Sequence, residues 1–520
     1  MGVCLAWLAA GTAGASTYRI DTQRQWQEWQ TPAGVVELGR DGSVRLVETG
    51  RREVNAVTTA GEFRHWSRDL KADVPGGIRN AGSSKAQADR CIDGHPDTWW
   101  QPAPRDGVDY WWVEVDLGRA VLARQVRLTF PDTAGARPFR FFSVFVSEGV
   151  QAVQAATTDF FSYRRVGTTI KPNAARTVAY DLHTYNPSRS TGEYLVTADT
   201  VDFAPVQYVR FVAEGFSEDA ALAEIEVEGQ RENLALGTLA RGGSLRSGTP
   251  AQAPFLIDGS MDKPWTTGSG NYWMDWRRMG KWFAWDLGAT FFVDQFVLLT
   301  TGHRDDPGAL PIFFENESQL YGYVVYTSDG TKAPVPEPEK GDLQYDVLSS
   351  VDNREAPLRW AFNHVFPRRR ARYLFGHTEH TYGYAFIYEL FLYATGYPAQ
   401  VQLESGFIDM GNSKTITALD WEADTPPGSR IVLWSRSGQT LTKEVRYFLK
   451  TGVEVSETKW RSLPPIARGR VEETVIPSSD WSTWSPPYRQ SGEVFLSPTP
   501  RRYLQLRVAL ETDDPQDIMC

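Results

Sequence analysis

The chain has 520 residues, enough for about three domains that each bury a hydrophobic core. Hydrophobic residues make up 41% of it and charged residues 23%, which excludes a disordered or collagen-like chain. With 54 basic and 64 acidic residues the net charge is −10, so the sequence lacks the basic surface of a nucleic-acid-binding protein. Three cysteines, Cys4, Cys91 and Cys520, are too few for a disulfide framework.

Residues 1–16 are predicted to be a secretory signal peptide. Val3 to Ala10 is a short apolar run, and Ala13-Gly14-Ala15 matches the small-residue pattern of a cleavage site. A cationic stretch before the run is missing, and a buried N-terminal helix is the alternative. No later apolar run has the length of a transmembrane helix. We therefore expect an extracellular or cell-surface protein without a transmembrane segment, and the scarcity of cysteines favours a bacterial source.

Short runs of alternating apolar and polar residues follow one another along the chain, and helical periodicity is scarce. In chain order they lie at 35–38, 44–47, 113–117, 123–130, 142–147, 208–213, 323–327, 427–432 and 502–508. The pattern predicts an all-β chain. Residues 17–75 are too few for a sandwich of their own, so we expect a short β-rich segment that packs on a neighbour.

An internal repeat is the most informative feature of the sequence. Its blocks are an Ile-Asp-Gly turn, an Asp-x-x-Trp segment, a strand that ends in Asp-Leu-Gly, and two closing strands. In the first copy they lie at 92–94, 97–100, 112–118, 208–211 and 224–227, and in the second at 257–259, 262–265, 282–288, 372–375 and 389–392. A repeat of this length is a whole domain.

This ordered set of motifs resembles the discoidin or coagulation-factor type C family. The resemblance implies tandem galactose-binding-like jelly-roll β-sandwiches at 76–230 and 231–398, in a family that includes many bacterial carbohydrate-binding modules. Strand patterns beyond them predict a third β-sandwich over 399–520.

The Asp93-Gly94 turn offers carboxylate oxygens beside exposed carbonyls, and Ca²⁺ prefers six to eight such oxygen ligands. The resemblance implies a structural Ca²⁺ in this loop. Its ligands would be the side chains of Asp93, Thr98 and Glu224 and the carbonyls of Ala88 and His95. The alternative is that Asp93 only caps the turn and Glu224 pairs with a base.

The second copy departs from this pattern, because Lys263 stands where the first copy has Thr98. A cation disfavours a second cation. We expect Lys263 to replace the metal by pairing with Asp258 or Glu389.

Tryptophans that recur at the same place in both copies are predicted to pack in the cores, namely Trp100 with Trp265 and Trp112 with Trp282. Aromatic residues found in only one copy are better candidates to stack on the apolar face of a sugar ring. The ligand-binding candidates are Trp99, Tyr110 and Trp111 with His95 and Arg105 in the first copy, and Tyr272, Trp273 and Trp276 in the second. The alternative is that these rings cover loops or contact a neighbouring domain.

No motif of a serine hydrolase, zinc protease, phosphate-binding loop or redox cysteine pair occurs. The sequence therefore favours a non-catalytic protein that binds glycans or glycoconjugates through discoidin-like modules. Two alternatives remain open: the accessory part of a larger secreted glycoside hydrolase, or an adhesive scaffold protein of the cell surface. The sequence leaves the identity of the glycan and the oligomeric state undecided.

Overall fold

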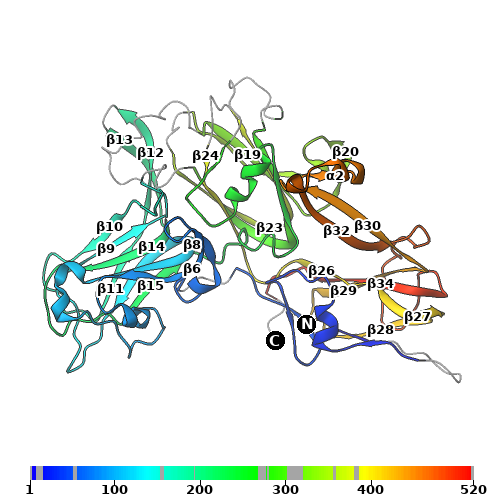
Figure 1. Ribbon diagram of the computed structural model, residues 1–520, viewed down its shortest axis with the longest axis horizontal. Coiled ribbons are helices and arrows are strands. Elements are labelled where there is room, and N and C mark those ends of the chain that lie inside the picture. Colours follow the sequence, from blue (N-terminus) through cyan, green and yellow to red (C-terminus); the bar gives the residue numbers. More distant parts are fainter. Residues whose placement is uncertain are drawn as a thin grey trace. The chain divides into compact units, whose positions relative to one another are not determined.

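The computed structural model describes residues 3–6, 16–50, 55–152, 157–191, 194–266, 277, 280–300, 320–354, 359–379 and 386–516. Strands dominate these residues (Figure 1), and their longest helices are the seven-residue 3₁₀ helices η2 (Lys85–Cys91) and η5 (Pro250–Leu256). The prediction of an all-β chain is confirmed. None of the helices in the described ranges has the length and apolarity to cross a membrane.

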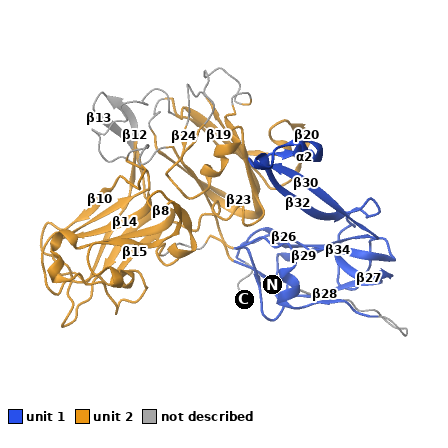
Figure 2. Ribbon diagram, viewed as in Figure 1, with its two compact units in different colours: residues 1–47, 397–520 blue, residues 48–396 orange. Residues whose placement is uncertain are grey.

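The chain forms two compact units (Figure 2). One contains residues 1–47 and 397–520, and the other contains residues 48–396. The segment predicted at 17–75 is therefore divided between them, and its first part folds together with the C-terminal sandwich.

The first sheet of residues 48–396 is built around the 18-residue strand β8. Its strands are β7 (Gly77–Ala81), β8 (Trp112–Thr129), β9 (Phe142–Ser147), β10 (Arg164–Thr168), β11 (Thr177–Asp181), β14 (Ala204–Ala213) and β15 (Glu224–Gly229). The first half of β8 pairs with β7 and β14, and its second half pairs with β11 and β15. Gly118, with a φ of 72°, lies between the halves, at a backbone angle that L side chains rarely adopt. One strand thus serves both layers of an antiparallel sandwich.

The second sheet repeats this arrangement around β18. Its strands are β16 (Ser244–Ser247), β18 (Trp282–Leu299), β19 (Gly322–Ser328), β22 (Asp346–Asp352), β23 (Ala361–Glu379) and β25 (Glu389–Ala394). The first half of β18 pairs with β16 and β23, and its second half with β23 and β25. The closing strands start at the same register, with Glu224 opposite Thr129 and Glu389 opposite Leu299. The sequence repeat therefore corresponds to two sheets with equivalent pairing.

Alternation along β8 explains the core of the first sandwich. Val113, Val115 and Leu117 are completely buried on one face of the strand. They pack with phenylalanines from the neighbouring strands and loops, such as Phe142 and Phe211. Burial of these side chains contributes roughly 1.5–3 kcal/mol each.

The two sandwiches share an apolar cluster, so they form one body. It contains Ala120, Leu122 and Phe203 from the first sandwich and Met261, Val297, Leu299, Ala361, Phe391 and Tyr393 from the second. The hairpin of β12 (Thr184–Thr191) and β13 (Tyr194–Val201) adds a polar contact. The fully buried Asn186 donates to the carbonyl of Ala361 at 3.0 Å and accepts from the backbone N–H of Ala361 at 2.9 Å.

The other unit is also a sandwich. One sheet contains β26 (Gln400–Glu404), β27 (Ile408–Lys414), β29 (Ser429–Gly438) and β34 (Arg501–Thr512). The other contains β1 (Val3–Ala6), β2 (Arg19–Ile20), β28 (Ala418–Ala423) and β33 (Glu493–Val494). The additional elements are α1 (Gln23–Gln27), β3 (Val36–Leu38), β4 (Val44–Leu46), β30 (Leu441–Leu449), β31 (Glu454–Val455), α2 (Glu457–Ser462) and β32 (Arg468–Pro477). The buried Trp26 of α1 donates its indole N–H to the carbonyl of Gly42 at 2.9 Å within the N-terminal segment, and the N–H of Gln30 donates to the carbonyl of Glu404 at 2.8 Å, which joins this segment to β26.

Replacement of Asn186 by alanine tests the polar contact between the sandwiches. Asn186→Ala leaves the buried N–H of Ala361 without its partner and the C=O with only a 3.4 Å contact from Arg359, so we expect a loss of about 1–3 kcal/mol in the free energy of unfolding. Calorimetric unfolding of the full chain measures it. The neighbouring Tyr185 is 49% exposed, and Tyr185→Ala should change the value by less than about 0.5 kcal/mol. Equal effects of the two substitutions would contradict a role for the buried amide.

Candidate functional site

The turn after residue 92 gathers oxygen atoms around one hydroxyl. Asp93 accepts a hydrogen bond from the backbone N–H of His95 at 2.9 Å. The hydroxyl oxygen of Thr98 lies 2.7 Å from the Asp93 carboxylate, 2.9 Å from the carbonyl of His95 and 3.4 Å from that of Arg90. The hydroxyl of Thr98 has one proton and can donate to only one of these three acceptor oxygens. The turn therefore holds more hydrogen-bond acceptors than donors.

Glu224, the first residue of β15, brings a second carboxylate to this turn. Its side chain is buried, and within the part of the chain that the structure describes neither carboxylate oxygen has a hydrogen-bond partner. Burial, and then the charge of Asp93, raise the pKa of Glu224 to about 7. Burial also acts to raise the pKa of Asp93, but hydrogen bonds from Thr98 and His95 hold it below its usual value.

These oxygens fit a hard cation. Ca²⁺ accepts carboxylate, hydroxyl and carbonyl ligands together, and a cation would compensate both carboxylates. The turn brings together four of the five predicted ligands, namely Asp93, Thr98, Glu224 and the carbonyl of His95. The carbonyl of Ala88, the fifth predicted ligand, accepts a 3.1 Å contact from a buried cysteine thiol. Within the described residues no three His, Cys, Asp or Glu side chains form a metal cluster, so a bound ion would depend on hydroxyl and carbonyl oxygens.

The second copy keeps the turn and the buried carboxylate. Asp258 accepts from the backbone N–H of Ser260 at 2.9 Å, as Asp93 does in the first copy. Glu389 is completely buried; one carboxylate oxygen accepts from the N–H of Gly259 at 3.2 Å, and the other has no partner among the described residues. Burial, followed by the charge of Asp262, raises the pKa of Asp258 to about 7, and burial raises that of Glu389 well above its usual value.

The prediction that Lys263 replaces the metal by ion pairing is wrong. Its ammonium lies 5.8 Å from the centre of the Phe255 ring, and no ion pair joins it to Asp258 or Glu389 in the described part of the chain. The charge of Lys263 still acts to lower the pKa of the exposed Asp258, whereas the fully buried Glu389 is left to compensate its charge with a proton.

The loop of the second copy is also a contact between the two sandwiches. The carbonyl of Gly259 accepts from the N–H of Ala120 at 2.7 Å, and Asp262 forms a 2.6 Å ion pair with Arg68. The corresponding turn of the first copy, at Asp93, is exposed. Asp258 of the second copy is exposed as well, whereas Gly259 beside it is buried.

Loops 82–85, 99–111 and 214–222 form one end of the first sandwich, which we call the loop rim. The backbone N–H of Trp100 donates to the carbonyl of Leu222 at 2.8 Å, and the backbone N–H of Ala103 donates to the hydroxyl of Ser83 at 2.8 Å. Of the predicted ligand-binding residues on or beside the rim, Tyr110 is 60% exposed, Arg105 and His95 are exposed, and Trp99 is half-buried.

Trp111 is not a ligand platform, which corrects the sequence prediction. Its ring is completely buried, and its indole N–H donates to the carbonyl of Ala103 at 3.3 Å. Phe216 packs against it with ring centroids 5.1 Å apart and is itself 61% exposed. Sequence reasoning missed Phe216, because a lone aromatic residue in a loop carries no periodic signal.

The repeated tryptophans divide into two kinds. Trp100 and Trp265 are completely buried, as predicted. Trp112 and Trp282 are half-buried, and the prediction that they are core residues is wrong. The guanidinium of Arg210 lies 4.4 Å from the ring centre of Trp112, so this ring lies on the outer face of the sheet.

The ligand-binding candidates of the second copy, Tyr272, Trp273 and Trp276, lie outside the described residues. Arg277 is described and forms a 3.1 Å ion pair with Glu339.

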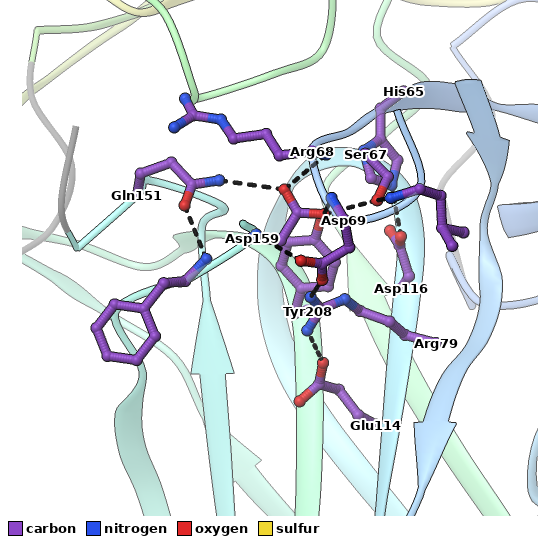
Figure 3. Close-up of polar contacts among 12 residues, drawn as sticks. His65, Ser67, Arg68, Asp69, Arg79, Glu114, Asp116, Gln151, Asp159 and Tyr208 are labelled. Carbon is purple, nitrogen blue, oxygen red and sulfur yellow. Dashed lines mark hydrogen bonds and ion pairs between the residues drawn. The ribbon is translucent and has the colours of Figure 1, made fainter. Parts of the chain in front are cut away.

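A hairpin covers the outer face of the first sheet (Figure 3). It consists of β5 (Arg64–Ser67) and β6 (Ala72–Pro75). His65 lies 2.5 Å from the buried carboxylate of Asp116, and Ser67 donates to Asp159 at 2.7 Å. Burial acts to lower the pKa of His65, but the hydrogen bond and charge of Asp116 raise it overall.

Charged groups beneath the hairpin compensate one another. Arg79 forms ion pairs with Glu114 and Asp69, and its guanidinium lies 5.3 Å from the ring centre of Tyr208 (Figure 3). Glu114 is 3% exposed. The hairpin and these charged groups therefore close this part of the sheet's outer face.

No protein-family model matches the chain, and no curated protein matches it. Among solved structures it is similar to an F-lectin (fucolectin) from the serum of striped bass, Morone saxatilis, with 16% identity over 62% of this chain and 96% of that one and a TM-score of 0.22. It is also similar to the family 32 carbohydrate-binding module of C. perfringens NanJ in complex with galactose, with 13% identity over 35% and 98% and a TM-score of 0.21. A third is a chitosan-binding module from Paenibacillus sp. IK-5 in complex with chitotriose, with 18% identity over 30% and 95% and a TM-score of 0.20.

Asp258 makes stability depend on pH. Its folded pKa of about 7 lies above the unfolded value of about 3.9, so the folded chain binds the proton more tightly, and stability falls as pH rises from about 4 to 7. Asp258→Asn removes this contribution. We expect the Tm of the variant, relative to wild type, to increase between pH 5 and pH 8 in the presence of a chelator. The exposed Asp97 supplies the control, Asp97→Asn. A Tm difference that is constant with pH would contradict the assignment.

Proposed function

We propose that the chain is a non-catalytic protein that binds carbohydrate at the loop rim of its first sandwich, outside the cell or on its surface. The observation that carries the proposal is the pair of exposed rings, Tyr110 and Phe216, beside the buried Trp111. Exposed aromatic rings fixed on a rigid base are what the apolar face of a sugar ring requires. The motif resemblance to discoidin-like carbohydrate-binding modules supports the same function.

Polar groups near these rings suit the hydroxyls of a sugar. Arg105 and His95 are exposed. Gln101 is half-buried and donates to the carbonyl of Glu218 at 3.4 Å, which joins two loops of the rim. Sites for saccharides combine stacking with such convergent donors and acceptors.

Calcium is the second part of the proposal. A Ca²⁺ ion held by Asp93, Thr98, Glu224 and the carbonyl of His95 would connect the start of β15 to the turn that precedes the rim. The ion would fix the loop and would not contact the sugar.

The same rim would serve either alternative role, as the accessory part of a secreted glycoside hydrolase or as an adhesive surface protein. Both need carbohydrate binding and differ in what the rest of the protein does. Binding at the rim is therefore the first property to test.

Tyr110→Ala and Phe216→Ala each remove one ring of the platform. We expect each substitution to weaken binding of a galactose- or chitosan-type oligosaccharide by up to about tenfold, with an unchanged Tm, since an aromatic stacking contact contributes about 0.5–1.5 kcal/mol. Isothermal titration calorimetry and a glycan array measure it.

Phe160 provides the matched control. It is 60% exposed in the same sandwich, but it lies after β9, and the pairing of Phe142 with Ala213 and of Ser147 with Tyr208 puts that loop at the opposite end. Phe160→Ala should leave sugar binding unchanged. A loss as large as that of Tyr110→Ala would move the site away from the rim.

Calcium should raise the Tm of the wild type by several degrees at pH 7.5, because it compensates Glu224. Glu224→Gln should abolish this increase and, in the presence of a chelator, should be at least as stable as wild type, since it removes a buried charge. Glu226→Gln, two residues along the same strand and half-buried, should respond to calcium as wild type does. Calcium stabilisation that survives Glu224→Gln would exclude this site.

A further inference from the structure

Two arginines on the outer face of the sheet formed by β26, β34 and β29 share a single carboxylate. Glu404 accepts from Arg507 at 3.2 and 2.9 Å, while Arg436 reaches it only at 4.0 Å. The three side chains are 22–28% exposed, so they are open to solvent but not fully hydrated. Around Glu404, two guanidinium groups therefore share one carboxylate.

Trp484 holds the two guanidiniums in place. Arg436 lies 4.7 Å and Arg507 4.1 Å from the centre of its ring. The backbone around Trp484 is fixed to β29, because the N–H groups of Ser482 and Ser485 donate to carbonyls of that strand at 3.0 and 2.8 Å. The arginines are preorganised and lose little conformational entropy when they bind a ligand.

Arg436 retains unused donors. Its Nε donates to Gln505 at 2.8 Å, and apart from the distant Glu404 its terminal nitrogens have no partner in the described residues. Burial, and repulsion by Arg507, lower the pKa of Arg436 despite the opposing effect of Glu404. A second anion at this place would relieve that imbalance, and a planar carboxylate or a sulfate oxygen pair matches the guanidinium fork.

Trp434 adds an aromatic surface beside these charges. It lies opposite Arg507 in the register of β29 and β34 and on the same face as Arg436, two residues along the strand. Its ring is half-buried, and Leu433 and Ser435 on either side of it are completely buried on the other face. The face thus combines anion-binding groups with a ring on which a sugar can stack.

We propose that this face binds an acidic saccharide, whose carboxylate or sulfate group lies on Arg436 and Arg507 and whose ring packs against Trp434. The site lies in the unit formed by residues 1–47 and 397–520. It is separate from the loop rim and does not depend on the function proposed for that rim. The chain is acidic overall, so attraction of a polyanion requires a local site of this kind.

Arg430 offers a matched control on the same strand and face. It forms ion pairs with Glu511 at 2.6 Å and Asp513 at 3.2 Å, so its charge is already compensated. Removal of Arg430 should leave the affinity for the acidic ligand unchanged, whereas removal of Arg436 should weaken it, because an ion pair with the ligand is lost.

The experiment titrates the full chain with galacturonate oligosaccharides, sulfated galactose oligosaccharides and neutral galactose oligosaccharides at low and high salt. We expect one or both acidic oligosaccharides to bind in a salt-dependent manner, and the stronger of the two identifies the anionic group. Arg436→Gln should weaken this binding about tenfold or more, and Arg430→Gln should change it less than about twofold. Glu404→Gln removes the competing carboxylate and should strengthen binding, an effect that a purely structural role for these residues would not produce.

Circular dichroism and Tm confirm folding of each variant, and Trp434→Ala supplies a second variant that leaves every ion pair intact. Equal binding of neutral and acidic oligosaccharides at this unit would overturn the proposal, as would equal effects of Arg436→Gln and Arg430→Gln. Tighter binding of an acidic peptide such as oligoglutamate than of every acidic oligosaccharide would also overturn it.

Discussion

Burial of a glutamate at the start of each closing strand is the constraint on which the larger unit depends. Strand register forces Glu224 and Glu389 inward, against an Asp-Gly turn that already holds a carboxylate. A buried carboxylate must gain a proton or a cation, and both copies retain this requirement. The first copy has an exposed, oxygen-rich turn that suits a metal, and in the second copy Gly259 of the turn contacts the first sandwich while Asp258 stays exposed.

The equivalent turns of the two copies have different surroundings. In the second copy, Gly259 and Asp262 contact the first sandwich, so this loop joins the two sandwiches. In the first copy, the turn leads directly into the loop rim, where Tyr110 and Phe216 are exposed. Turns at equivalent places in the two sheets thus make different contacts.

The all-β fold and the repeat could be predicted because the Asp-Leu-Gly turns and period-two strands are local signals. The orientation of the residues at the start of β8 could not be predicted. Trp111 and Trp112 are adjacent, so one must be buried and the other must face outward, and the sequence does not say which. The join between residues 16–47 and the C-terminal sandwich, and the approach of Arg436 to Trp484 and Arg507, depend on long-range topology. No local pattern encodes those contacts.

The most direct test of the central claim is a crystal structure of the chain grown with calcium and galactose. The account predicts an ion with oxygen ligands at about 2.3–2.6 Å from Asp93, Thr98, Glu224 and the carbonyl of His95, with the sugar ring on Tyr110 or Phe216. A protonated Glu224 that donates to Asp93 in saturating calcium, with no ion between them, would contradict it.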